Sequence, residues 1–91
     1  MTILRIVNRG LDRKTYETMR SMLDIDRQHP LGLIMHGASE VDGRMQVAQV
    51  WESDEYARRF DEELLKPVLE ALGVSSEAEI AVFDLEHLVT P

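Results

Sequence analysis

Apolar and polar residues alternate along the chain in a pattern that predicts short strands and two helices. The β-branched run over 2–7 ends at the turn-forming Asn8, so we predict a first strand there. Asp12 is placed to cap a helix over 13–24. An apolar stripe at the three-to-four spacing of a helix supports this element, formed by Tyr16, Met19 and Leu23 with Met22 beside them.

The strongest local signal is a hairpin in the middle of the chain. Asp42 and Gly43 supply the two positive-φ positions of a type I′ turn. Runs of largely apolar residues precede and follow this pair. The sequence therefore predicts two antiparallel strands, over 33–41 and 44–52.

A two-residue turn fixes which residues of the hairpin oppose each other. It places His36 opposite Gln49 and Ile34 opposite Trp51. Because side chains alternate between the two faces of a strand, the register also predicts the content of each face. One face carries Ile34, His36, Ala38, Met45, Val47, Gln49 and Trp51, and the other carries Leu33, Met35, Gly37, Val41, Ala48 and Val50. Both faces are therefore largely apolar.

A second helix should begin after Ser53, which is a favourable N-cap followed by acidic residues that suit the positive end of the helix dipole. Pro67 removes a backbone donor, so we expect a kink or a restart there. The second piece should end at Leu72, with Gly73 as the C-terminal cap. The stripe expected to face the sheet comprises Ala57, Phe60, Leu64, Val68 and Leu72.

A last strand is predicted over 80–89, with Pro91 behind it. The resulting order, in a single domain over 1–91, is that of the ferredoxin-like βαββαβ fold, an α+β fold with both helices on one face of a four-stranded antiparallel sheet. That arrangement leaves the second face bare although the hairpin is apolar on both faces, so we expect a homodimer to cover it. The alternative is a solvated mixture, because the face that bears Met35 also carries Ser39, Arg44 and Gln46.

Composition narrows the classes of partner. With 44% hydrophobic and 30% charged residues, the chain is expected to fold rather than remain disordered. It has no cysteine, which excludes disulfides, thiolate metal sites and a cysteine nucleophile. The net charge of −7 opposes binding to nucleic acid and to anionic membrane surfaces. No apolar run approaches the ~20 residues of a membrane span, and no signal-peptide pattern is seen, so a cytoplasmic location is expected.

The segment from Val50 to Tyr56, followed by Phe60, Leu64 and Pro67, resembles a signature of the dimeric α+β barrel superfamily, and most closely small proteins related to the antibiotic biosynthesis monooxygenase family. This resemblance implies two ferredoxin-like sheets paired into a barrel. It also implies a cavity between sheet and helices for an aromatic or polyketide-like ligand. Many members need no metal or prosthetic group, and others degrade haem.

Catalytic members of that family often carry a histidine on the second helix, at the position that Phe60 fills here. This departure counts against haem ligation and against a directly inherited monooxygenase site. We therefore expect no cofactor. No metal site is predicted either, because His29, His36 and His87 lack the short spacing that ligand pairs commonly show.

His36 is the sharpest candidate for a catalytic residue. It lies in the middle of a predicted strand, with Gln49 opposite and Trp51 diagonal, and a neutral imidazole beside an amide could orient or deprotonate a phenolic ligand. The alternative is a hydrogen-bonded histidine of the core or an interface. The predicted ligand-binding set is Gln49, Trp51, Tyr56, Phe60 and Met19, whose alternative role is to fill the core.

Arg5 is unusual because it lies inside the first apolar run. We expect it to form a salt bridge across the sheet rather than an anion site. Asp84 and Glu86, on the last predicted strand, are the candidate partners.

Two functions fit the sequence. The first is a dimer that binds a small apolar or aromatic ligand, or a protein partner, without catalysis. The second is a cofactor-independent, monooxygenase-like enzyme that acts on an aromatic or polyketide-like compound. The missing helix histidine and the lack of a clear acid–base pair favour the first.

Overall fold

The computed structural model of the protein describes residues 1–89, so the expected position of Pro91 lies outside it. The elements follow the predicted order, with one addition inside the second helix. In chain order they are β1 (Ile3–Asn8), α1 (Arg13–Leu23), β2 (Leu33–Val41), β3 (Arg44–Trp51), α2 (Asp54–Phe60), the π-helical segment η1 (Asp61–Leu65), α3 (Lys66–Ala71) and β4 (Glu79–Asp84).

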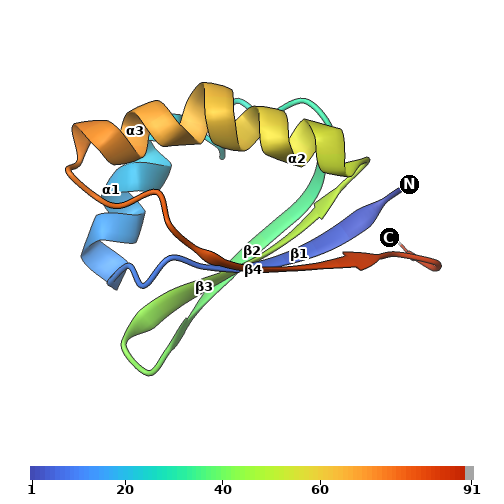
Figure 1. Ribbon diagram of the computed structural model, residues 1–91, viewed down its shortest axis with the longest axis horizontal. Coiled ribbons are helices and arrows are strands. Elements are labelled where there is room, and N and C mark those ends of the chain that lie inside the picture. The colour runs from blue at the N-terminus through green and yellow to red at the C-terminus, as the bar shows by residue number, and fades with distance from the viewer. Residues whose placement is uncertain (90–91) are drawn as a thin grey trace.

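The four strands form one antiparallel sheet in the order β2-β3-β1-β4. All helices lie on the same side of it (Figure 1). There, α2, η1 and α3 form one nearly continuous rod across the sheet, and α1 lies beside the α3 end. The predicted ferredoxin-like βαββαβ fold is therefore confirmed, including the bare second face.

Helix α1 begins and ends with local hydrogen bonds. The Asp12 carboxylate accepts a hydrogen bond of 2.8 Å from the Thr15 N–H, which satisfies one of the free donors at the helix start. Asp24 ends the helix in the left-handed conformation, with φ 53°. Tyr16 and Met19 are buried as predicted, whereas Met22 is exposed. The helix therefore presents a narrower apolar stripe to the sheet than its composition suggests.

The central hairpin forms in the predicted register except at its base. Asp42 and Gly43 both have positive φ, as a type I′ turn requires, and His36 pairs with Gln49. The expected pairing of Ile34 with Trp51 is wrong, because a β-bulge lies between Leu33 and Met35 and Leu33 pairs with Trp51 instead. The extra residue inverts the alternation, so Leu33 packs against the core while Ile34 is exposed.

The second helix contains one residue more than the regular α-helix from which its buried stripe was predicted. Ala57 and Phe60 are buried as expected, and Val68 and Leu72 are half-buried against the core. Leu64 is exposed instead of buried, and the buried positions of this part are Leu65 and Leu69. The cause is η1, whose π-helical turn accommodates an extra residue and shifts the following stripe by one position.

Of the kink and the restart expected at Pro67, with the kink favoured, the structure shows the restart. Helix α3 begins at Lys66, so the proline lies in its first turn, where the missing N–H costs little. Gly73 follows the helix with φ 69°, and its N–H donates to the Glu70 carbonyl. The glycine therefore caps the helix as predicted, because its left-handed conformation suits a residue without a side chain.

The last strand is shorter than predicted. We expected residues 80–89, but β4 spans Glu79–Asp84. Its partner β1 is six residues long, and pairing runs from Asn8 opposite Glu79 to Ile3 opposite Asp84. One further bond, from the Leu85 N–H to the Thr2 carbonyl, closes the ladder. Within residues 1–89, the segment 86–89 lies beyond the start of β1 and belongs to no strand.

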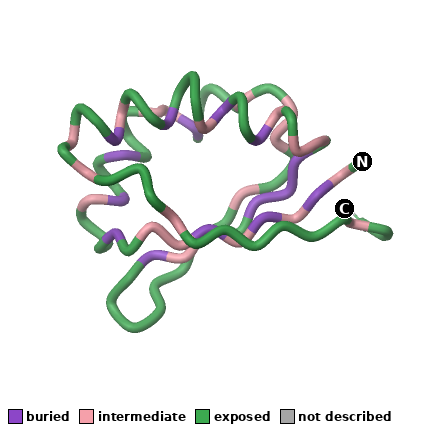
Figure 2. Tube along the Cα trace, viewed as in Figure 1, coloured by how far each residue is buried: buried purple, intermediate pink, exposed green. Residues whose placement is uncertain are grey.

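The hydrophobic core lies between the sheet and the helices, and buried positions recur along both the strands and the helices (Figure 2). Trp51 and Leu69 are its largest fully buried side chains. Trp51 packs against Phe60 with a distance of 5.4 Å between ring centroids and an interplanar angle of 44°. This contact joins β3 to the rod above it.

Candidate functional site

A cavity of about 40 Å³ lies between the sheet and the helices. Side chains from β1, β2, β3, α1, α2 and η1 line it. Most of its wall is apolar, including Val7, Leu11, Met19, Ile25, Val47 and Phe60. Its polar groups come from Arg5, Arg9, Tyr16, Arg20, His36, Gln49 and Asp61. An apolar wall with a few placed polar groups is typical of a small-molecule site.

Four of the six sequence-predicted site residues line this cavity: Met19, His36, Gln49 and Phe60. Trp51 does not, because it is fully buried in the core. Its indole N–H donates a hydrogen bond of 3.0 Å to Oε1 of Gln49. Since this bond uses the amide oxygen, it orients the side chain of Gln49. Trp51 therefore acts on the cavity wall through Gln49 and Phe60, the two lining residues that it contacts.

Tyr56 also lies outside the cavity. Its ring packs over Gly32, where an added Cβ would overlap Cγ of Tyr56. Gly32 has φ 86°, so both its backbone and its lack of a side chain are needed there. The contact fixes the loop before β2 against the start of α2. Tyr56 therefore holds a loop in place and does not line the cavity.

His36 has a hydrogen-bonding partner that the sequence analysis did not anticipate. Its Nε2 lies 3.1 Å from the hydroxyl of Tyr16 on α1. Burial lowers the pKa of His36, and the positive charge of Arg20 lowers it further, while Asp26 opposes the shift. Burial likewise raises the pKa of Tyr16. The pair is therefore neutral at pH 7, and one hydrogen bond can run from the phenol to Nε2.

Nδ1 of His36 is buried and has no hydrogen-bond partner among residues 1–89. If Nε2 accepts from Tyr16, Nδ1 carries the proton and can donate to a ligand. If Nε2 donates to Tyr16, Nδ1 is an acceptor and can take a proton instead. In both cases the imidazole has one nitrogen held by the protein and one available for a bound molecule.

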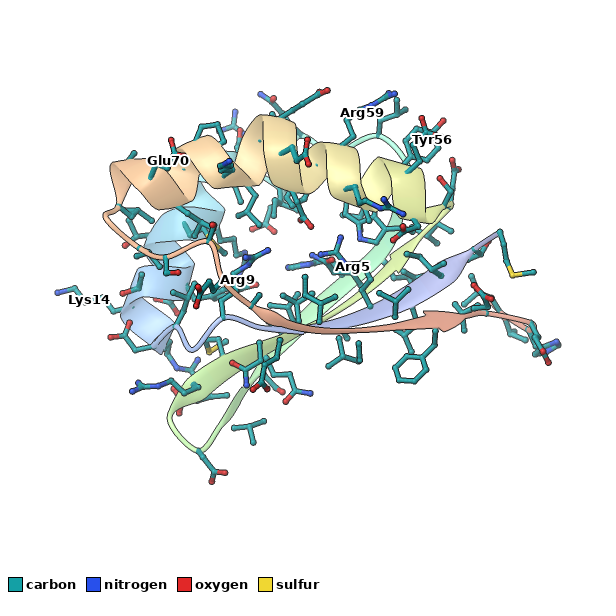
Figure 3. All side chains as sticks on the ribbon, in the orientation of Figure 1. Arg5, Arg9, Lys14, Tyr56, Arg59 and Glu70 are labelled. Atoms are coloured by element: carbon teal, nitrogen blue, oxygen red, sulfur yellow. The ribbon has the colours of Figure 1, made fainter. Side chains whose placement is uncertain are left out.

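A charged cluster forms the other polar part of the cavity. Nη2 of Arg5 donates to Oδ2 of Asp61 at 2.8 Å, and Nη2 of Arg9 lies 3.9 Å from Oδ1 of the same carboxylate. Figure 3 shows both arginines reaching from the sheet into the space beneath the helices. The salt bridge expected for Arg5 is confirmed, but Asp84 and Glu86 are the wrong partners. Asp61 supplies the carboxylate from the rod above.

The sequence contained a signal for Asp61 that we did not use. It lies four residues after the buried Ala57, so it falls on the stripe that faces the sheet. A carboxylate on the stripe that faces the sheet needs a buried cation as its partner. Arg5 is the candidate, because it lies within the apolar run of β1 and on the buried face of that strand. Tyr16 gave no such signal, because a tyrosine on an apolar stripe is ordinarily core.

Two further classes of site can be assessed from the geometry. Among residues 1–89, no three His, Cys, Asp or Glu side chains gather closely enough to hold a metal ion. In the same range, no helix has the length and apolar character to cross a membrane.

No protein-family profile matches the sequence, and no curated protein matches it. Several solved structures share its fold. A protein of unknown function from Nitrosomonas europaea is similar with a TM-score of 0.72 and 11% identity, over 99% of this chain and 94% of that one. SnoaB, a cofactor-independent oxygenase from Streptomyces nogalater, has a TM-score of 0.63 and 16% identity, over 99% and 96%.

A candidate antibiotic biosynthesis monooxygenase from Deinococcus radiodurans has a TM-score of 0.59 and 14% identity, over 100% of this chain and 98% of that one. Coverage is nearly complete on both sides in all three cases. The chain therefore has the fold of the antibiotic biosynthesis monooxygenase structures, as the resemblance around Trp51 implied.

Proposed function

We propose that the protein binds a small aromatic molecule between its sheet and its helices. The observation that carries this proposal is the mixed lining of the cavity. Met19 and Phe60 offer an apolar surface to a ring, and the neutral pair of His36 and Tyr16 offers a donor and an acceptor to its substituents. The fold shared with a cofactor-independent oxygenase supports it.

The ligand must widen the cavity in order to enter. A volume of about 40 Å³ is far below the roughly 300–1,000 Å³ of typical ligand pockets. A surface groove of about 320 Å³ lies next to it, and Ile25 and His36 line both spaces. Ile25 belongs to the loop after α1, where its movement would join groove and cavity. We therefore place the entrance between this loop and β2.

A homodimer is part of the proposal, because the second face of the sheet is apolar and uncovered. The register aligns four apolar residues in one row across all strands, namely Met35, Val50, Leu4 and Phe83. At the two outer strands, Met35 is 52% exposed and Phe83 is 53% exposed. An apolar patch that spans a sheet is unusual on a monomer, and a second copy supplies a face of the same character.

Ligand binding can be tested with a neutral probe, para-fluorophenol, in a fluorine NMR titration. We expect a saturable shift or broadening of the probe resonance in the wild-type protein. Met19→Phe enlarges a side chain of the cavity wall and should weaken binding severalfold. The matched control is Met22→Phe, on the exposed side of the same helix, which should bind as the wild type does. Equal weakening by both variants, or no saturation, would contradict the proposal.

A second candidate function is a cofactor-independent oxygenase. It is favoured by one observation: His36 is held neutral and has one free nitrogen, so it can take the proton of a phenolic ligand. Dioxygen would then accept electrons from the resulting phenolate. Oxygen uptake with polycyclic phenols, such as naphthols, tests this function. Uptake that is unchanged in His36→Ala would remove the role of His36.

A further inference from the structure

The polar part of the cavity has more positive than negative charge. Arg5 and Arg9 contribute two positive charges around the one negative charge of Asp61, which leaves this cluster with a net charge of +1. The third arginine of the lining, Arg20, is paired with Asp26 at 2.6 Å. These groups are shielded from water: the side chains of Arg5 and Arg9 are 3% and 9% exposed, and that of Asp61 is 24% exposed. A buried excess charge is costly unless a counter-charge accompanies it.

The hydrogen bonds of the cluster are also incomplete. Arg5 donates to Asp61 through a single nitrogen rather than in the paired mode that a guanidinium and a carboxylate can adopt. Its Nε is buried and has no partner among residues 1–89. Arg9 donates through Nη1 to the Ser76 carbonyl and is 3.9 Å from Oδ1 of Asp61, which accepts no hydrogen bond. Donor capacity therefore remains for another acceptor.

The positive charge of this cluster is opposite in sign to the net charge of the whole protein. The chain has a net charge of −7, and that field repels anions at long range. Burial lowers the pKa of Arg9, while Asp61 opposes the shift and Arg5 adds to it, so the excess charge carries an energetic penalty. An anion bound beside Arg5 and Arg9 would relieve this penalty.

The geometry of the sheet indicates where the two ends of such a ligand would lie. Arg5, Gln49 and His36 form one row across β1, β3 and β2 on the helix-facing side. Adjacent strands are about 4.8 Å apart, so the backbones of Arg5 and His36 are separated by about 10 Å. A ring lying along this row could have an acidic group at the arginines and a second polar group at His36.

We propose that the ligand of this cavity is an aromatic carboxylate, with the carboxylate held by Arg5 and Arg9. The proposal rests on the proposed function and adds the chemical class of the ligand. The ring would lie against Phe60, and a hydroxyl or carbonyl at the opposite end would meet the free nitrogen of His36. Asp61 keeps the two arginines in place and limits the affinity for the anion.

The test compares two probes of nearly equal shape, para-fluorobenzoate and the neutral para-fluorobenzamide, by fluorine NMR at fixed salt concentration. We expect the wild-type protein to bind the carboxylate about tenfold more tightly, as a charge-assisted hydrogen bond provides. Arg9→Gln should bring this ratio close to one. The matched control is Arg13→Gln, which removes the same charge from an exposed arginine paired with Glu40 and should leave the ratio unchanged.

Asp61→Asn provides an independent readout in the opposite direction. Removal of the competing carboxylate should raise the affinity for benzoate severalfold and leave that for benzamide unaltered, an outcome that a purely structural salt bridge does not predict. Thermal melting checks that each variant is folded. Equal binding of the two probes, both weakened by Met19→Phe, would overturn the carboxylate proposal and leave the proposed function standing. Binding of neither probe would overturn both.

Discussion

The face of the sheet that the helices cover carries a polar row, and the face that they leave open carries an apolar one. The face beneath the helices carries a row of polar residues, Arg5, Gln49 and His36, on the three adjacent strands β1, β3 and β2. The other face has no cover within the chain, yet its corresponding row is apolar, with Met35 and Phe83 at the outer strands.

This contrast separates two uses of burial. Polar groups beneath the helices are tolerated because each has at least one partner: Asp61 for Arg5, Trp51 for Gln49 and Tyr16 for His36. Apolar groups on the open face have no such explanation within one copy of the chain. Under the proposals above, the covered face would hold a ligand and the open face would pack against a second copy of the chain.

The largest expected effect comes from a charge on the open face. Ala48 is exposed near the middle of that face, so Ala48→Arg would bury a positive charge in the proposed dimer. A buried charge without a partner costs about 3–5 kcal/mol, enough to dissociate a dimer at micromolar concentration. Sedimentation equilibrium should report twice 10.4 kDa for the wild type and 10.4 kDa for the variant.

The control for this experiment is Ala71→Arg, which adds the same charge to an exposed position of α3. This variant should remain dimeric. If the wild-type protein were monomeric at micromolar concentration, the open face would not be a dimer interface.

A smaller effect is expected from the charged pair of the covered face. Arg5→Leu leaves the Asp61 carboxylate without its 2.8 Å partner, and we expect it to lower the free energy of unfolding by about 3 kcal/mol. The double variant Arg5→Leu with Asp61→Leu removes both charges and should recover most of this loss. Urea unfolding at one protein concentration measures the wild type, the two single variants and the double variant, since the stability of a dimer depends on concentration.

If the double variant were destabilised by the sum of the two single effects, the charges would not be coupled. The polar row would then be a set of independent positions rather than a partnered network.

The smallest effect concerns the pH dependence of stability. Burial holds the pKa of His36 below its usual 6.5 in the folded protein. The unfolded chain therefore takes up a proton below pH 6.5 at a site that the folded chain keeps neutral, so the free energy of unfolding decreases as the pH falls through this range. Above pH 6.5 both states are neutral and this contribution is constant.

His36→Gln should flatten that decrease, and His29→Gln, which removes an exposed histidine, should follow the wild type. Urea unfolding at several pH values on either side of 6.5 measures the slopes. A slope unchanged by His36→Gln would mean that the imidazole is solvated and that the covered face is wetter than the structure indicates.

Much of the fold could be predicted from local chemistry. The turn at Asp42 and Gly43 set the hairpin register, and with it the pairing of His36 with Gln49. Capping residues marked the start of the two helices, at Asp12 and Ser53, and the end of the second, at Gly73. The face of β3 on which Trp51 lies was predicted as well, because side chains alternate between the two faces of a strand.

Two of the errors in the fold share one physical origin. Both the bulge before Met35 and the π-helical turn at Asp61 add a single residue to an otherwise regular element. Apolar residues stand on both sides of each insertion, so a regular pattern fits the sequence equally well. Packing against residues distant in the sequence decides whether Leu33 or Ile34 faces the core, and whether Leu64 or Leu65 does. The hydrophobic period of the sequence does not contain this information.

The site was predicted in part for the same reason. Strand register brought His36 and Gln49 together, but Tyr16 and Asp61 reach the cavity from helices whose placement depends on tertiary packing. Pairs within the sheet could therefore be derived from sequence, and pairs between sheet and helix could not.

The π-helical turn has a consequence for anyone who redesigns the rod above the sheet. Each residue of an α-helix rotates the side-chain direction by about 100°, so one surplus residue puts the part before Asp61 and the part after it out of phase. A single helical wheel drawn over residues 54–71 would assign Leu64 to the inner surface and Leu65 to solvent. Two wheels, drawn separately, are needed to choose substitutions that spare the interior.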